Sequence, residues 1–175
     1  MATLKEMLRD EILATYAATE KLIQKVEPDG LGWKPNTGSN WMTVGQLLKH
    51  ITEACGMCIK GFVTGDWGMP DGMKLEDLKP EDMLPPAEKL PSFSCVEEAL
   101  EALAIDKQIA LEHLEAVSEE DLHTTLKTAP WGGPPATLGQ HILHMVGHLG
   151  QHKGQLFYYL KLQGQPVHTG DLWGM

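Results

Sequence analysis

Four amphipathic segments, each opened by the same helix-start signal, most constrain the fold of this 175-residue chain. In that signal, the capping box, a Ser or Thr side chain bonds the backbone N–H three residues on, and an acidic or Gln side chain there bonds back. The boxes begin at Thr3, Thr43, Ser94 and Thr137. Apolar residues at helical spacing follow each box and predict helices over residues 3–26, 43–63, 94–117 and 137–161. Four such helices without a convincing run of strands predict an all-α four-helix bundle.

The connections between these segments indicate the order of the helices. Residues 65–94, with five prolines, separate the second helix from the third and form too long a connection for a helix hairpin. A long crossover of this kind joins consecutive parallel helices in a bundle. We expect short helical turns near residues 75–78 and 80–83, a small extended hairpin within 118–135, and a helix end at Gly164. The whole chain, 1–175, is predicted to form a single domain.

Charge and composition exclude several classes of partner. The net charge of −10 argues against nucleic acid and anionic membranes, because both require a basic surface. No apolar run is long enough to span a membrane, and the charged N-terminus lacks the apolar core of a secretory signal. Three cysteines, an odd number, argue against a disulfide framework. A cytoplasmic protein is therefore expected.

The fourth segment carries four of the eight histidines of the chain, His141, His144, His148 and His152. At about 100° per residue these four side chains share one narrow stripe of a helix. His148 and His152 lie closer to the apolar face of that helix than His144, which is turned furthest from it, and His141 is also angled inward. His141 sits in the first turn and is interpreted as a helix-end residue. The alternative to a binding site is a polar helix face or a set of hydrogen-bonded core histidines.

A second feature directs attention to His50, the only histidine among the first 112 residues. Residues 43–50 repeat the pattern of residues 137–144, and His50 lies at the edge of its apolar face. Three neutral imidazoles from two helices, His50, His148 and His152, predict a metal site with open coordination positions, as catalytic sites have. His144 is the alternative ligand.

Imidazole suits zinc, nickel, iron or copper, and the sequence does not choose among them. Zinc and nickel are the first candidates for this divalent transition metal, with iron and manganese next. The ion could lower the pKa of bound water or hold a substrate thiolate. Gln151 and Gln155 are candidate hydrogen-bond partners of the ligating histidines. Trp67 or Trp131 is expected to line the mouth of a pocket beside the metal.

The pair Cys55 and Cys58 forms a C-x-x-C pattern that has a structural interpretation. Redox pairs of this spacing sit at helix N-termini, where the thiol pKa is lowered. Here the pair is expected in the middle of the second helix, on its apolar face. We therefore interpret both cysteines as small buried hydrophobic residues.

Three motifs together resemble the DinB-like (YfiT-like) superfamily of metal-dependent bundle proteins. The motifs are Trp33-Lys-Pro followed by the 43–51 helix opening, His144-x3-His148-x3-His152-Lys-Gly-Gln, and the ending Leu162-Gln-Gly-Gln-Pro166. The resemblance spans nearly the whole chain in order. It implies an up-down-down-up bundle and a divalent-metal site at His50, His148 and His152. It also implies frequent homodimers.

The resemblance also suggests an activity. Members of known activity are similar to S-transferases and isomerases that use low-molecular-weight thiols such as bacillithiol or mycothiol, and others are labelled hydrolases. We therefore expect a metal-dependent enzyme that activates a low-molecular-weight thiol for S-transfer, or water for hydrolysis, on a small-molecule substrate. The alternative is a non-enzymatic metal-binding or stress-related interaction protein.

Overall fold

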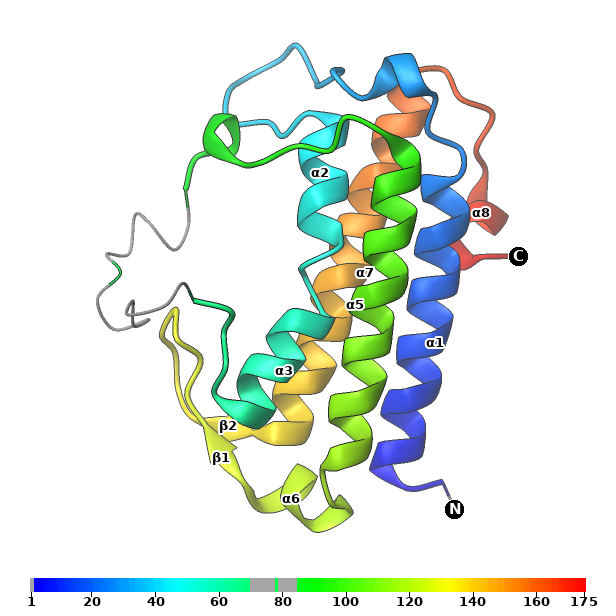
Figure 1. The fold of residues 1–175 in the computed structure, drawn as a ribbon. Helices are drawn as coiled ribbons and strands as arrows, with labels where there is room; N and C mark the ends of the chain where they lie inside the picture. Colours follow the sequence, from blue (N-terminus) through cyan, green and yellow to red (C-terminus); the bar gives the residue numbers. More distant parts are fainter. Residues whose placement is uncertain (1, 70–77, 79–84) are drawn as a thin grey trace.

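The computed structural model describes residues 2–69, 78 and 85–175, and this part of the chain is mostly helical (Figure 1). The main helices are α1 (Leu4–Ile23), α2 (Val44–Ile51), α3 (Gly56–Thr64), α5 (Val96–Ala116) and α7 (Leu138–Leu162). The shorter elements are η1 (Pro28–Gly30), η3 (Ala87–Lys89), α6 (Glu119–Thr124), β1 (Leu126–Lys127), β2 (Ala136–Thr137) and α8 (Thr169–Trp173). The prediction of a mostly helical protein is confirmed. Within the described ranges, no helix is both long and apolar enough to cross a membrane.

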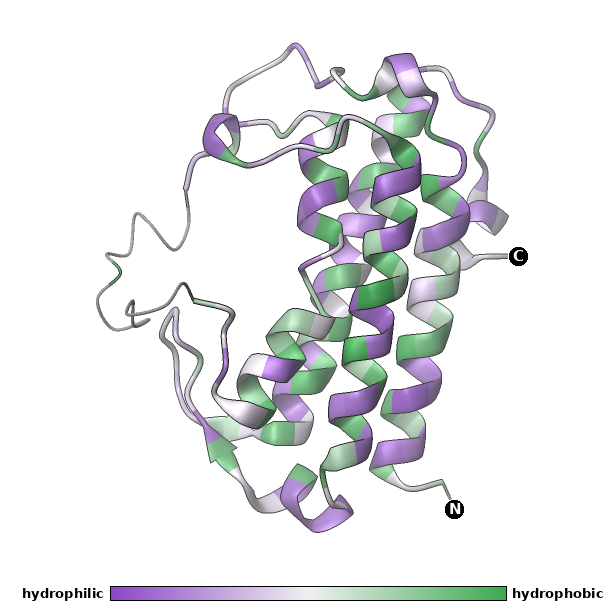
Figure 2. Cartoon of the chain, in the orientation of Figure 1, coloured by the Kyte–Doolittle hydropathy of each residue, from purple (hydrophilic) through white to green (hydrophobic). Residues whose placement is uncertain are grey.

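The main helices pack around one hydrophobic core. Helix α1 contacts α5 and α7, and α3 contacts the same two helices from the other side. Figure 2 shows hydrophobic and hydrophilic residues alternating along these helices, as expected for amphipathic segments. Their apolar stripes meet in one cluster whose fully buried members include Ile12, Leu22, Leu48, Ile59, Leu114, Ile142 and Leu149.

Three of the four predicted capping boxes form. Thr3, Thr43 and Thr137 each accept a hydrogen bond from the backbone N–H three residues on, and the side chain at that position bonds back. The end of α7 also follows the prediction, because Gly164 adopts the left-handed conformation (φ 83°) that ends many helices. The small hairpin predicted within 118–135 is present as the β1–β2 pair, although its second strand begins one residue later, at Ala136.

The capping box predicted at Ser94 is wrong. Helix α5 begins one residue later, with Cys95 at the N-cap position and no side-chain cap bond. The Glu97 carboxylate, which the box would direct at Ser94, instead accepts from the Cys95 thiol (2.6 Å). The chain ahead of α5 is held by α2, because the backbone N–H of Phe93 donates to the carbonyl of Gly45 (3.2 Å). A contact between distant segments thus displaces the local signal.

The continuous helix predicted over residues 43–63 is also wrong. The segment forms two helices, α2 and α3, separated by a break at residues 52–55. The break lets the start of α3 pack closely on α5, where the Asp106 carboxylate accepts from the backbone N–H groups of Gly56 and Met57 (2.9 Å each). The turns predicted near 75–78 and 80–83 fall almost wholly on residues outside the described ranges.

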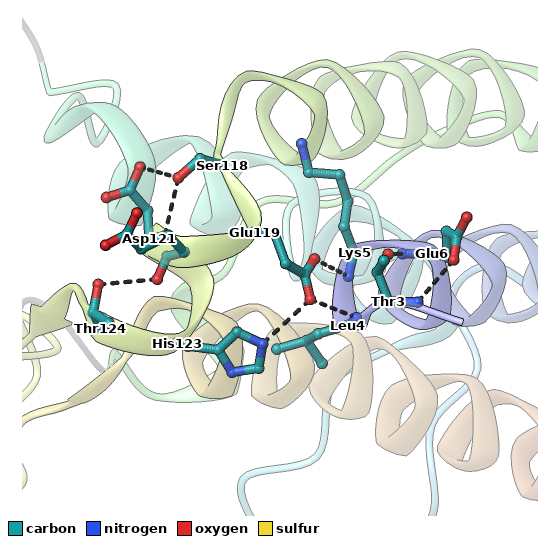
Figure 3. A network of polar contacts seen from close by, with 10 residues as sticks. Thr3, Leu4, Lys5, Glu6, Ser118, Glu119, Asp121, His123 and Thr124 are labelled. Carbon is teal, nitrogen blue, oxygen red and sulfur yellow. Dashed lines mark hydrogen bonds and ion pairs between the residues drawn. The ribbon is translucent and has the colours of Figure 1, made fainter. Parts of the chain in front are cut away.

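The first turn of α1 has all four of its backbone N–H groups bonded, and α6 supplies two of the acceptors. The Glu119 carboxylate of α6 accepts from the N–H groups of Leu4 (2.8 Å) and Lys5 (3.0 Å), as Figure 3 shows. Thr3 accepts from the other two, one through its side chain and one through its carbonyl. The bond from Lys5 contributes most to a lowered pKa of Glu119. Glu119 therefore joins the start of α1 to α6.

Replacing Glu119 with Gln should lower the midpoint of urea unfolding, because the amide presents a donor to one of the two N–H groups. A carboxylate whose pKa is lowered on folding stabilises the folded state above its unfolded pKa, and this contribution is lost as the pH falls through the folded pKa. The difference between wild type and Glu119→Gln should therefore be full at pH 7 and shrink below pH 4.5, the ordinary value for Glu. Glu120→Gln, at an exposed neighbouring position of α6, is the matched control. Equal midpoints for the two variants at pH 7 would contradict this role.

Candidate metal centre

Three histidine side chains converge between α2 and α7. His50 lies in the last turn of α2, and His148 and His152 are one turn apart on α7. The Nε2 atom of His152 is 3.0 Å from Nε2 of His50 and 3.0 Å from Nε2 of His148, and the candidate ligand atoms of all three lie within 4.8 Å of one another. With metal–nitrogen bonds of about 2.1 Å, neighbouring nitrogens in a tetrahedral or octahedral site stand about 3.0–3.4 Å apart. The three imidazoles could therefore hold a metal ion.

A chain of hydrogen bonds fixes the tautomer of His152. The carbonyl of Met42 can only accept, so the hydroxyl of Tyr159 donates its single proton there (3.2 Å). Tyr159 must then accept from the amide nitrogen of Gln155 (3.1 Å), which turns the amide oxygen toward Nδ1 of His152 (3.0 Å). Nδ1 of His152 is therefore the protonated nitrogen, and Nε2 carries a lone pair.

His148 is held in the same tautomer by the backbone. Its Nδ1–H donates to the carbonyl of Ala54, in the break between α2 and α3 (3.2 Å). The Nε2 atoms of His148 and His152 therefore both present lone pairs at 3.0 Å, an arrangement that repels unless a proton or a cation lies between them. The donor set thus fits a divalent cation.

Burial keeps two of these imidazoles neutral, the form in which histidine binds metal. Desolvation, reinforced by the neighbouring His152 and His148, lowers the pKa of His50 to about 4. Desolvation also lowers the pKa of His152, although the hydrogen bond to Gln155 opposes it. Protons therefore compete weakly for these nitrogens near neutral pH.

A cavity of about 720 Å³ adjoins the histidines. Its lining combines two of the three histidines with apolar side chains and a few polar ones: His50, Glu53, Ala54, Cys58, Trp131, Leu143, His144, Met145, Gly147, His148 and Gln151. His144 is exposed and lines this cavity, outside the group of three. Trp131 lines the cavity, whereas Trp67 packs edge-on against Trp131 (5.9 Å between ring centroids) and against Phe62 (5.0 Å).

His141 has a structural role that the first-turn position alone did not reveal. Its ring is buried and stacks on Phe62 of α3 at 4.1 Å. Its Nε2 lies 2.9 Å from the carbonyl of Lys127 in β1. His141 lies near the start of α7 and connects that end of the helix to α3 and to the hairpin.

The prediction that the cysteine pair lies in the middle of a helix is wrong, because the break between α2 and α3 places the pair at the start of α3. Cys55 is the N-cap residue of α3, and Cys58 lies in its first turn. Burial raises the thiol pKa of Cys58 to about 12 and raises that of Cys55 as well, the reverse of the shift that makes a thiol reactive. Both cysteines are free, and their interpretation as hydrophobic residues fits this environment.

Asp106 is a buried acidic residue that was not predicted from the sequence as part of the site. Its carboxylate is buried, with 2% of the residue exposed, and it also accepts from the Tyr16 hydroxyl (2.6 Å). A signal was present, because Asp106 is in helical phase with the buried residues Leu103, Ala110 and Leu114. An acidic residue on an apolar stripe indicates a buried group with dedicated partners.

Fold and site together define a mostly helical protein in which three histidines, between two helices, are placed so that they could bind one metal ion. The family model of the DinB superfamily matches residues 11–156, so the chain belongs to the DinB superfamily. The fold is similar to that of a DinB-like protein from Bacillus cereus ATCC 10987 (15% identity, TM-score 0.67, covering 92% of this chain and 93% of that one). It is also similar to a DinB-like protein, YjoA, from Bacillus subtilis (17% identity, TM-score 0.64, covering 92% and 94%). No curated protein matches the chain.

Replacing Gln155 with Ala should weaken zinc binding by roughly 10–100-fold, the usual effect of removing the partner that orients a ligating histidine. The reason is that His152 would lose the acceptor for its Nδ1–H, and the ring could then rotate or change tautomer. Competition titration with a zinc indicator dye measures the affinity. Gln151→Ala, one residue before His152 and exposed at the cavity, is the matched control and should bind zinc like the wild type. Equal affinities for the two variants would exclude this role of Gln155.

Proposed function

We propose that His50, His148 and His152 bind a divalent transition metal and that the protein is a metal-dependent enzyme. The observation that carries this proposal is the pair of Nε2 lone pairs, on His148 and His152, fixed 3.0 Å apart by their Nδ1 partners. His50 completes the group from a second helix. Three protein ligands leave coordination positions for water or substrate. Zinc and nickel suit such a donor set, and iron and manganese are further candidates.

The reaction we propose is S-transfer from a low-molecular-weight thiol, or hydrolysis by water. A bound divalent ion would supply a thiolate or hydroxide near neutral pH. The chain supplies the surroundings, since the cavity beside His50 and His148 has a volume suited to a small molecule. Its exposed apolar side chains, Trp131 and Leu143, would bind an apolar part of the substrate. S-transfer is placed first on family likeness alone.

We further infer that residues 1–175 form one domain with up-down-down-up helix order. The support is a single hydrophobic cluster and the course of the helices, with α1 and α7 running toward the end near η1 and α2, α3 and α5 running away from it (Figure 1). A homodimer and a cytoplasmic location are proposed from the family likeness and the composition. A non-enzymatic metal-binding protein is the alternative function.

Protein purified without a histidine tag and reconstituted with zinc or nickel should contain about one equivalent of metal per chain. His50→Ala should lose this metal while keeping its helical circular dichroism, because His50 is one of three ligands and lies at the edge of the core. His144→Ala, which changes an exposed histidine at the same cavity, should keep its metal. Metal content is measured by inductively coupled plasma mass spectrometry. Less than about a tenth of an equivalent in the wild type would contradict the metal site.

The metal-loaded protein should catalyse thiol conjugation to small electrophiles or hydrolysis of small esters and amides, and a chelator should abolish the activity. Readdition of metal should restore it, and His50→Ala should be inactive, because each reaction needs the ion to generate the nucleophile. A panel of thiols and electrophiles, assayed with and without chelator, provides the measurement. Activity that resists the chelator would refute this mechanism. Full metal loading without turnover across the panel would favour the non-enzymatic alternative.

A further inference from the structure

The start of α3 lacks a cap of its own and takes one from α5. Cys55 occupies the N-cap position of α3 without a side-chain cap bond. The Asp106 carboxylate takes over this role: Oδ2 accepts from the backbone N–H of Gly56 (2.9 Å) and Oδ1 from that of Met57 (2.9 Å). A carboxylate at a helix N-terminus also interacts favourably with the helix dipole.

Close packing fixes the position of this cap. A Cβ atom added to Gly56 would lie 2.0 Å from the backbone oxygen of Asp106, so the first turn of α3 lies directly against α5. The Tyr16 hydroxyl donates to the same carboxylate at 2.6 Å. Burial raises the pKa of Asp106, and the three donors that point at its two oxygens oppose this shift and fit the ionised form.

The same break carries the acceptor for a histidine of the metal centre. Ala54 lies two residues before Gly56, and its carbonyl accepts from Nδ1–H of His148 (3.2 Å). In an unbroken helix this carbonyl would accept from the backbone four residues on, at Cys58. The geometry points to Asp106 as a positioning residue: by capping α3 it holds the break that presents the Ala54 carbonyl to His148, and so directs Nε2 of His148 at the ion.

The first test uses the metal-free protein, so it does not depend on the proposed function. Asp106→Asn keeps the size of the side chain but places an amide donor against an N–H or O–H group. Long-range ¹H–¹⁵N NMR of the histidine rings should show His148 protonated at Nδ1 in the wild type, because the bond to the Ala54 carbonyl outweighs the repulsion between the facing Nε2 atoms. In Asp106→Asn the same ring should be a mixture of tautomers. A folded Asp106→Asn variant that retains the wild-type tautomer would overturn the inference.

Two controls separate positioning from general loss of stability. Tyr16→Phe removes one donor from the carboxylate and leaves both backbone bonds of the cap. Leu103→Ala creates a cavity one turn away on the same helix. Both variants should unfold at lower urea concentration, yet both should keep the wild-type tautomer of His148. Loss of that tautomer in Leu103→Ala would show a merely structural effect and overturn the inference.

The second test rests on the proposed function and uses cobalt(II) as the probe. Asp106→Asn should weaken cobalt binding about tenfold, the low end of the range for lost support of a ligating histidine, and should shift the visible bands of the bound cobalt. The two controls should match the wild type in both readouts. A wild type that binds no cobalt, zinc or nickel would refute the proposed metal site, whereas a wild type and Asp106→Asn with equal affinity and spectra would refute only the role of Asp106.

If Asp106→Asn does not fold, Gly56→Ala tests the same contact from the other side. The added methyl group must push the first turn of α3 away from Asp106. The expected result is again a mixture of His148 tautomers and a shifted cobalt spectrum. An unchanged tautomer in folded Gly56→Ala would contradict the proposed link between the cap and His148.

Discussion

The hydrogen bonds from Gly56 and Met57 to the Asp106 carboxylate are the interaction on which the rest of the site depends. In a helix that ran unbroken from α2 into α3, the Ala54 carbonyl would accept a backbone hydrogen bond within the helix. His148 would then lose its acceptor. The break therefore does more than separate two helices. Burying a carboxylate is costly, and here three donors from α3 and α1 offset that cost.

A second set of contacts determines which ring nitrogen of His152 carries the lone pair. On α7, Gln155 and Tyr159 follow His152 at three and seven residues, so all three side chains share one face. The backbone carbonyl of Met42 ends this chain of bonds with a group that can only accept. Each proton in this series of three hydrogen bonds therefore points away from the Nε2 atom of His152. The partners of the two Nδ1 atoms are neutral groups, the Gln155 amide oxygen for His152 and the Ala54 backbone carbonyl for His148.

Much of this arrangement could be predicted from local patterns, and the rest depends on contacts between distant segments. Helical periodicity on α7 and a repeated helix opening on α2 were enough to bring His50, His148 and His152 to attention. The break was not visible, because a single Gly56 costs a helix only about 1 kcal/mol and the apolar pattern continues through it. Its cause, Asp106, is 50 residues away. The failed cap at Ser94 has the same origin, since Phe93 is bonded to α2.

Different parts of the chain form the histidine cluster and shape the cavity. The three histidines come from α2 and α7. His148 is oriented by the Ala54 carbonyl at the break, and His152 by Gln155, whose amide is fixed through Tyr159 and the Met42 carbonyl. Trp131, by contrast, lies in the loop that connects β1 to β2. Its ring packs edge-on against Phe62 of α3 and against Trp67, just after α3. Side chains on the hairpin can therefore change without disturbing the lone pairs of His148 and His152. In the mechanism proposed for this protein, the helices would determine how a nucleophile is activated, and the hairpin would determine which molecule reaches it.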